Sequence, residues 1–236
     1  MNKKNLSQII IFIVFSLVFP MTYSQTLPIV KVNFVFATNH SAATKYDHAE
    51  QMKKELSILN QYFVDEQEQK IFDFKLNKYL TYDTFNNKNC KLSQILEQPK
   101  TIEHSTLISA FNMCFYSQPQ KSGLPEVYLF IFDAYAPDAG FKSTTSWGFS
   151  NAGKPLILID WERLNYNIQA AVPHEMGHAF GLRHVCIKNA KTRDNTNIMA
   201  SRGNCDGSGG LRNQGFNQEQ VKIILKNYQA IKESQH

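Results

Sequence analysis

Three histidines, one glutamate and one glycine stand in residues 174–184 at spacings that suit a catalytic metal site. The segment reads H-E-M-G-H-A-F-G-L-R-H. On a helix, His174 and His178 lie one turn apart on the same face, so both imidazoles can bind one tetrahedral zinc ion. Glu175 stands beside them, where its carboxylate can reach a water molecule on the metal and act as general base. The pattern predicts metal-assisted hydrolysis.

The third ligand, His184, has to approach the metal from another direction, because the next turn of the same helix cannot supply it. Gly181 precedes it, and glycine readily adopts the left-handed conformation that ends a helix and reverses the chain. We therefore predict a three-histidine zinc site with one position left for water. The five-residue part of this motif could arise by chance on an amphipathic helix, but all five specified positions together are much harder to obtain that way.

The eleven-residue motif resembles the signature of the metzincin clan of zinc endopeptidases, in which a methionine follows in a tight turn beneath the metal. Met199 lies fifteen residues past His184, in the sequence N-I-M-A-S, and the resemblance implies that it is the Met-turn residue. Without the zinc motif, Met199 would be interpreted as an ordinary core methionine.

Within the clan, the chain is most similar to the pappalysin-type enzymes, on the sequences L-N-Q-Y-F at 59–63, N-I-M at 197–199 and a cysteine before Phe216. The resemblance implies an α/β (α+β) catalytic domain that has a twisted mixed sheet, an active-site helix, a Met-turn and a C-terminal helix. One departure is Ser201, which stands where several families have a tyrosine that helps to hold the oxyanion.

Hydrophobic patterning predicts the elements that position these residues, and their order also fits an α/β fold. Apolar and β-branched runs predict strands at 29–37, 71–82, 127–132 and 155–159. Spacings of three and four predict helices over 49–63, 105–114 and 221–228, the last one capped by Asn217 and Gln220. Pro173 belongs in the first turn of the active helix or marks a kink. Residues 83–125 otherwise give little pattern.

Residues 144–149, T-T-S-W-G-F, precede the last predicted strand and have the character of an edge strand. Metzincins carry their substrate along such a strand. The resemblance therefore implies a peptide or protein substrate paired in extended form with residues 145–150, where backbone bonds give affinity and side-chain pockets give preference. The alternative is an edge strand that only faces solvent.

The first 24 residues predict a signal peptide and an exported protein, either secreted or periplasmic. Lys3 and Lys4 precede the apolar run 9–19, which is too short for a membrane span of about 20 residues, so we expect no stable membrane insertion. The mature chain would be one catalytic domain, residues 25–236. Loss of the two lysines lowers its formal charge from +5 to +3, and no basic tract suggests nucleic acid. The oligomeric state stays open.

Four cysteines in an exported chain favour two disulfides, for which three pairings exist. We favour Cys186 with Cys205, because they bracket the segment that contains Met199, and Cys90 with Cys114 then follows. Zinc ligation by cysteine is disfavoured because the histidines already complete the site. Calcium binding by Asp206, in a loop rich in glycine and asparagine, is a weaker prediction.

These observations predict a secreted zinc-dependent metalloendopeptidase that uses a zinc-activated water and Glu175 as general base. Two alternatives stay open: a secreted zinc-containing binding protein without general proteolytic activity, and a hydrolase of narrow specificity. The remaining histidines have no partners at metal-binding spacing and are assigned no role; they are His40, His48, His104 and His236.

Overall fold

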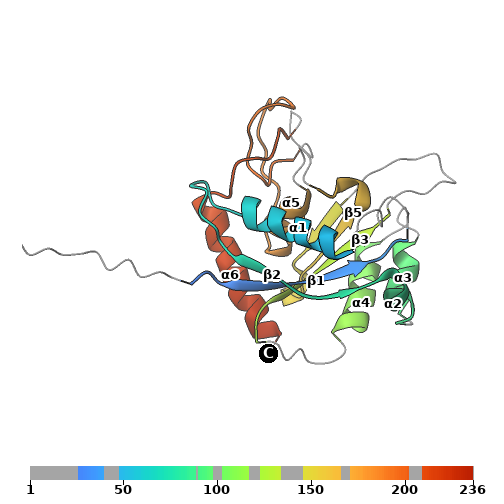
Figure 1. Cartoon of the computed structure of the whole chain (residues 1–236). Coiled ribbons are helices and arrows are strands. Elements are labelled where there is room, and N and C mark those ends of the chain that lie inside the picture. Colours follow the sequence, from blue (N-terminus) through green and yellow to red (C-terminus); the bar gives the residue numbers. More distant parts are fainter. Residues whose placement is uncertain are drawn as a thin grey trace, which may run out of the picture.

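A computed structural model gives the fold of the chain (Figure 1). It describes residues 26–39, 48–88, 90–97, 103–116, 123–133, 146–165, 171–201 and 209–235. The predicted signal peptide, residues 1–24, lies outside this set. Among the described residues, no helix combines the length and the apolar character needed to cross a membrane.

The centre of the fold is a five-stranded mixed sheet in the order β2-β1-β3-β5-β4. Its strands are β1 (Ile29–Phe36), β2 (Asp73–Leu80), β3 (Glu126–Phe132), β4 (Ser146–Phe149) and β5 (Leu156–Asp160). Four strands run parallel, and β4 pairs antiparallel with β5 at one edge. The predicted α/β (α+β) fold class with a twisted mixed sheet is confirmed.

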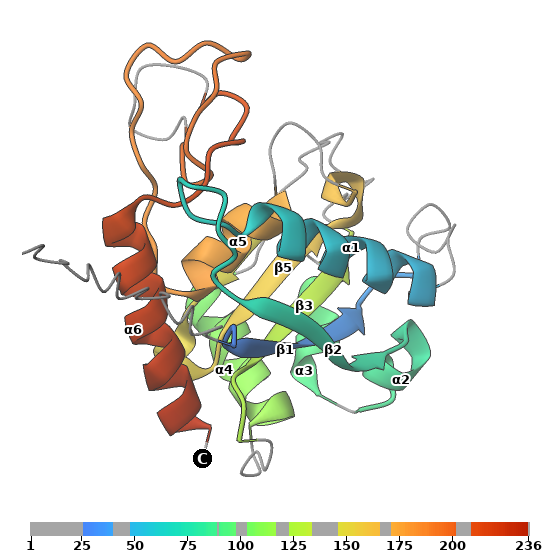
Figure 2. The ribbon, with the colours of Figure 1, turned by 60° about the vertical axis from the view of Figure 1, so that its left-hand side comes forward.

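Helices cover both faces of the sheet (Figures 1 and 2). They are α1 (His48–Tyr62), α2 (Tyr82–Asn86), α3 (Lys91–Leu96), α4 (His104–Phe115), α5 (Ala171–Ala179) and α6 (Gln218–Ser234), with short 3-10 turns η3 (Asn151–Gly153) and η4 (Trp161–Arg163). Side chains from α1, α5 and α6 share one hydrophobic core, and those from α2, α3 and α4 share the other. Helix α5, which carries His174 and His178, therefore lies on the same face as α1 and α6.

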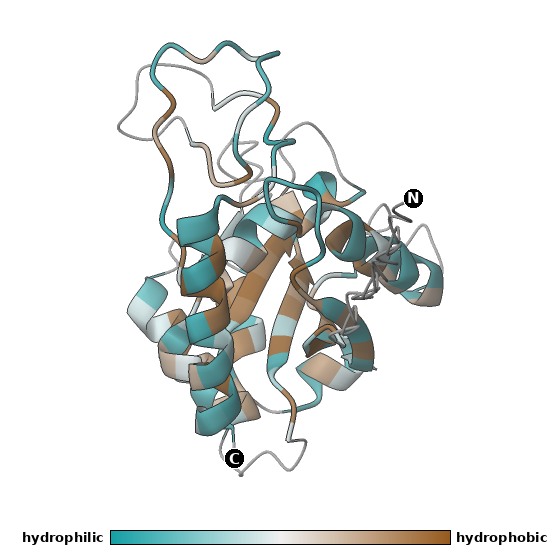
Figure 3. Ribbon diagram, turned by 90° about the vertical axis from the view of Figure 1, so that its left-hand side faces the viewer, coloured by the Kyte–Doolittle hydropathy of each residue, from teal (hydrophilic) through white to brown (hydrophobic). Residues whose placement is uncertain are grey.

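Alternation along β3 supplies both cores, because successive side chains of a strand point to opposite faces. Leu129 and Ile131 join the core under α5, whereas Phe130 and Phe132 join the core under α4, and all four are fully buried. Figure 3 shows the strands as mainly hydrophobic and the outer side of α6 as hydrophilic. A strand buried on both faces explains why its sequence is a continuous apolar run.

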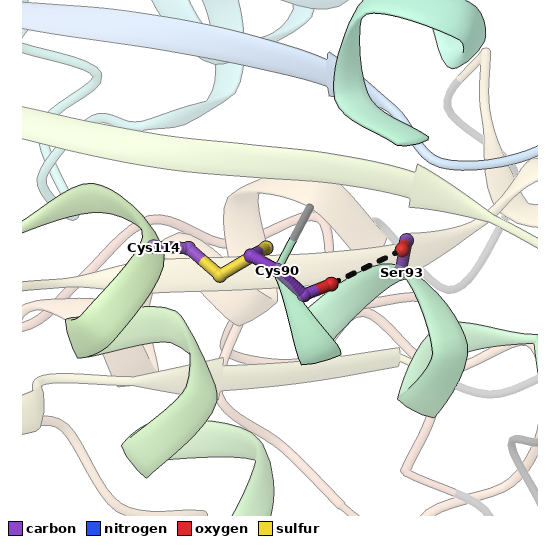
Figure 4. Close-up of a disulfide and its surroundings, with 3 residues drawn as sticks. All are labelled: Cys90, Ser93 and Cys114. Carbon is purple, nitrogen blue, oxygen red and sulfur yellow. Dashed lines mark hydrogen bonds between the residues drawn. A yellow bond between two sulfur atoms is a disulfide. The ribbon is translucent and has the colours of Figure 1, made fainter. Parts of the chain in front are cut away.

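Two short helices, α2 and α3, lie almost wholly within residues 83–125, where little periodic pattern is visible in the sequence. The Thr81 side chain caps α2 by accepting a hydrogen bond from the Thr84 N–H at 3.2 Å. Cys90 begins α3 and forms the expected disulfide with Cys114 of α4, as Figure 4 shows. Covalent attachment and burial of their apolar residues, rather than helix length, hold these elements in place.

Strand β2 is shorter than the predicted 71–82. Ile71 and Phe72 precede it and are buried in the core under α5. The side chain of Asn60 on α1 both donates to the carbonyl and accepts from the N–H of Phe74, each at 2.9 Å. This amide clamp fixes α1 against the start of β2.

The end of α6 and the start of β3 are joined by one buried side chain. Gln235 accepts a hydrogen bond from the Glu126 N–H at 2.8 Å and donates to the Glu126 carbonyl at 3.0 Å. At its other end, α6 has the predicted capping box of Asn217 and Gln220. Both ends of this helix are therefore fixed by specific hydrogen bonds.

Glu55 on α1 is a fully buried carboxyl that lies outside the zinc motif. Its Oε1 accepts from the Asn165 N–H at 2.8 Å and from the Gln51 amide at 2.7 Å. Its Oε2 has no hydrogen-bond partner among the residues that the structure describes. Burial raises the pKa of Glu55 to about 7, against the lowering effect of these hydrogen bonds.

Glu55 should therefore make the stability of the protein depend on pH. The unfolded carboxyl ionises near 4.5 and the native one near 7, so this group favours folding below about pH 4.5. That contribution, about 3 kcal/mol, is lost as the pH rises through 7. We expect Glu55→Gln to remove this part of the pH dependence in urea unfolding at about pH 5 and pH 8.

The matched control is Glu50→Gln, which removes an exposed carboxyl from the same helix. It should leave the pH dependence of the wild type in place. An unfolding free energy that changes with pH equally in wild type and Glu55→Gln would show that Glu55 ionises normally in the native state.

Candidate metal centre

Helix α5 carries the first two histidines and Glu175 in its buried part. The helix begins at Ala171, so Pro173 lies in the first turn, where a missing N–H costs no intrahelical bond. The side chains of His174 and Glu175 are only 3% and 5% exposed. The start of the helix thus places two polar groups deep in the fold, where each needs a specific partner.

Gly181 ends this part of the chain with a left-handed turn, as predicted. Its φ is +85°, and the Leu182 N–H donates to the Gly177 carbonyl at 3.0 Å while the Gly181 N–H donates to the His178 carbonyl at 2.8 Å. These two bonds form a Schellman motif, which satisfies the last carbonyls of a helix. The chain then reverses and brings His184 back towards α5.

The three predicted ligands converge on one point. Nε2 of His184 lies 3.2 Å from Nε2 of His174 and 2.9 Å from Nε2 of His178. One nitrogen from each ring lies within 4.8 Å of the others, as a shared metal ion requires. Among the His, Cys, Asp and Glu side chains of the described residues, these three histidines form the group that could hold a metal ion.

Two of the rings are oriented by backbone carbonyls on the side away from the cluster. Nδ1 of His174 lies 2.7 Å from the Ile198 carbonyl, and Nδ1 of His178 lies 2.8 Å from the Leu182 carbonyl. A carbonyl can only accept, so Nδ1 carries the proton and Nε2 presents its lone pair. The donor set therefore suits zinc, which binds neutral imidazoles held in this way.

Met199, the residue predicted for a Met-turn, packs against α5 at Gly177. It is fully buried, and a Cβ at Gly177 would collide with its sulfur. The Met199 carbonyl also accepts a hydrogen bond from the Val185 N–H at 2.8 Å, directly after the third ligand. The turn is thus in contact with both chain segments that supply histidines.

Burial lowers the pKa of all three histidines, most strongly for His174. The positive charge of Arg212 lowers each pKa further. Arg212 is held by a 2.7 Å hydrogen bond from its Nε to the Ala200 carbonyl, next to Met199. The histidines are consequently neutral at physiological pH, which is the form that binds a metal.

Glu175 lies beside the cluster and has hydrogen-bonded support of its own. Burial raises the pKa of Glu175 to about 7, and a hydrogen bond from Ser146 and the charges of Arg212 and Arg163 oppose that rise. Ser146 Oγ lies 2.7 Å from Glu175 Oε1, and Arg163 Nη1 lies 2.9 Å from Ser146 Oγ. A carboxyl with a pKa near neutrality is suited to accept and release a proton.

Strand β4 passes very close to the active helix, and Gly148 permits this approach. A Cβ at this position would collide with the Glu175 carbonyl oxygen and lie 2.8 Å from the His178 Cβ. The strand forms the edge of the sheet, and no described strand pairs with its other side. Ser146, Trp147 and Gly148 fall within the predicted substrate segment; Thr144 and Thr145 lie outside the described residues.

Several other predictions concern residues around this site. Cys186 is disulfide-bonded, but its expected partner Cys205 lies outside the described residues, as do the calcium candidate Asp206 and His40 and His236. His48 stacks on Phe36 with ring centroids 3.8 Å apart, and His104 makes edge contacts with Trp147 and Phe149. These two histidines therefore belong to aromatic packing.

Sequence reasoning missed Arg163 and Arg212, and it placed Ser146 in the predicted substrate segment without its contact to Glu175. None of them belongs to a motif with fixed spacing, and Arg163 follows the last buried strand by only a few residues. The one sequence signal that could have pointed to Arg163 is its place just after the end of β5 and shortly before α5. The sequence carries no comparable signal for Arg212.

No family model matches the chain, and no curated protein matches it either. Among solved structures, the chain is similar to one described as "Mirolysin in complex with compound 9". The two have 10% sequence identity and a TM-score of 0.45, over 88% of this chain and 96% of that chain. At this level of similarity, function has to be inferred from the residues of the site itself.

The donor set predicts one zinc ion per chain with an affinity that depends on all three histidines. His184→Ala removes one of three donors and should weaken zinc binding by more than about 100-fold. Chelator competition followed by elemental analysis measures this. The control is His104→Ala, which changes an exposed histidine outside the cluster and should bind zinc as the wild type does. A zinc affinity of His184→Ala equal to that of the wild type would point to another third ligand.

The close approach at Gly148 predicts a destabilising effect of the smallest added side chain. Gly148→Ala should lower the unfolding free energy by about 1–3 kcal/mol, because the new Cβ meets backbone rather than a movable side chain. Ser150→Ala, just after the same strand, is the control and should be nearly neutral. Urea unfolding of both variants checks this, and an unchanged Gly148→Ala would mean that β4 can move away from α5.

Proposed function

We propose that the chain is an exported zinc-dependent metalloendopeptidase. The observation that supports this most directly is the combination of three converging imidazole nitrogens with the Glu175 carboxyl beside them. Structural zinc sites usually fill all four positions with protein ligands, whereas catalytic sites keep one position for water or substrate. Three donors together with an adjacent carboxyl fit the catalytic class.

His174, His178 and His184 would hold the metal. Zinc bound by them supplies a Lewis acid and lowers the pKa of its water from about 15.7 towards 7. Glu175 accepts the proton of the attacking water molecule and then delivers it to the nitrogen of the leaving amine.

The substrate would be a peptide or protein segment bound in extended form along β4. This strand lies at the sheet edge and passes directly over α5, so a peptide paired with it would run past Glu175. Main-chain hydrogen bonds to an edge strand give affinity that is largely independent of sequence. Recognition by backbone suits an endopeptidase, which has to bind the middle of a chain.

Export is supported by the cysteines. Cys90 and Cys114 form a disulfide and Cys186 is disulfide-bonded as well. Disulfides persist in oxidising compartments and are rare in the cytosol. The proposed location is therefore outside the cytoplasm, either secreted or periplasmic.

The role of Glu175 can be tested with the mature chain, residues 25–236, and an unbiased peptide library. Glu175→Gln keeps the shape of the side chain but cannot accept the proton, so kcat/KM should fall by about 10²–10⁴-fold while zinc stays bound. Glu233→Gln, an exposed carboxylate on α6, should cleave as the wild type does.

Retained cleavage in Glu175→Gln would exclude Glu175 as the general base. A wild type that binds zinc but cleaves nothing in the library would favour a zinc-containing binding protein. Cleavage that survives zinc removal by a chelator would exclude the metal mechanism altogether.

A further inference from the structure

Glu175 is connected to the edge strand by a short chain of hydrogen bonds. Arg163 Nη1 donates to Ser146 Oγ at 2.9 Å, and Ser146 Oγ lies 2.7 Å from Glu175 Oε1. Ser146 is the first residue of β4, and Arg163 is the last residue of η4, which follows β5. Strand β4 thus contacts one oxygen of the proposed general base through Ser146, and η4 supports that contact through Arg163.

The direction of each hydrogen bond in this chain is fixed by the chemistry of its members. A guanidinium has only donors, so Ser146 Oγ has to accept from Arg163. A hydroxyl has one proton, and Glu175 Oε1 is the acceptor within reach of it. The Ser146 proton therefore points at Oε1, and the hydroxyl cannot rotate without losing both bonds.

The backbone around both residues is also well defined. Ser146 pairs with Ile159 in the β4–β5 ladder, two residues before the close contact of Gly148 with α5. The turn η4 is capped by Asp160, whose Oδ1 accepts from the Glu162 N–H at 2.9 Å, and the Asp160 side chain is buried. Ser146 and Arg163 therefore both belong to regular elements, β4 and η4.

We propose that Ser146 and Arg163 are positioning residues for Glu175. They hold Oε1 in a fixed direction and leave Oε2 as the oxygen that exchanges the proton during peptide hydrolysis. This inference rests on the proposed function of the site and adds two residues to it. Because Ser146 belongs to the strand along which the substrate would bind, substrate and base are placed by the same element.

The positive charge of Arg163 explains why an arginine, rather than a second hydroxyl, stands at the end of this chain of hydrogen bonds. A hydrogen bond from a cation is stronger than one between neutral groups, and it favours the ionised form of the carboxylate beyond Ser146. Arginine presents its donors in a rigid plane, so one donor can be aimed at Ser146 with little loss of side-chain freedom. Arg163 thus orients Glu175 through Ser146, and its charge lowers the pKa of Glu175 as well.

The test compares four zinc-loaded variants of the mature chain: Ser146→Ala, Ser146→Thr, Arg163→Met and the double change Ser146→Ala with Arg163→Met. Ser146→Ala should lower kcat about 10- to 100-fold with KM within about twofold and zinc content unchanged. Ser146→Thr keeps the hydroxyl and should recover most of that loss. Arg163→Met should lower kcat, and the double variant should be no slower than Ser146→Ala alone, because the pair acts as one unit.

Other kinetic results would overturn the proposal. Losses that multiply in the double variant would mean that Arg163 acts independently of Ser146. A higher KM with an unchanged kcat would assign the pair to substrate binding. Wild-type kcat in Ser146→Ala would show that Glu175 needs no such support.

A structural measurement keeps this test separate from the proposed function. In crystals of the zinc-loaded Ser146→Ala chain, the Glu175 carboxylate should leave its wild-type orientation or occupy two, while the three histidines stay in place. An unmoved carboxylate contradicts the proposal whether or not the chain cleaves peptides. Absence of cleavage by the wild type, with a displaced carboxylate in Ser146→Ala, would refute the peptidase function and retain the positioning role.

Discussion

Contact of the turn at 197–200 with helix α5 is the interaction on which the metal centre depends. The Ile198 carbonyl orients His174, the Met199 sulfur lies against Gly177, and the Met199 carbonyl binds the N–H that follows His184. A displacement of this turn would therefore disturb both chain segments that supply ligands. The small size of Gly177 is what lets a thioether approach the helix so closely.

The same region illustrates how charge is managed in a buried site. Burial alone makes ionised groups costly, and it keeps the histidines neutral while it raises the pKa of Glu175. The charges of two arginines oppose the rise in the pKa of Glu175. Arg212 donates to the Ala200 carbonyl, next to Met199, and Arg163 donates to Ser146. The result is a set of neutral donors beside one carboxyl that remains able to ionise.

Much of this arrangement follows from local sequence, and the rest depends on contacts between distant residues. Some features depend on residues that are adjacent in the sequence, so their periodicity or turn chemistry can be recognised there. Examples are the buried strand β3, the cap of α6 and the turn at Gly181. Helices α2 and α3 are too short for a periodic pattern. The bond between Arg163 and Ser146 joins common residue types in η4 and β4, and only the fold brings them together.

The amide of Gln235 has a consequence for how the molecule is assembled. It binds both backbone groups of Glu126 at the start of β3, the central strand of the sheet. A ribosome adds residue 126 about halfway through synthesis and residue 235 almost at its end, so this end of β3 stays without its native partner throughout the second half of synthesis. The last hydrogen bonds at the start of the central strand therefore form only after nearly the whole chain has been made.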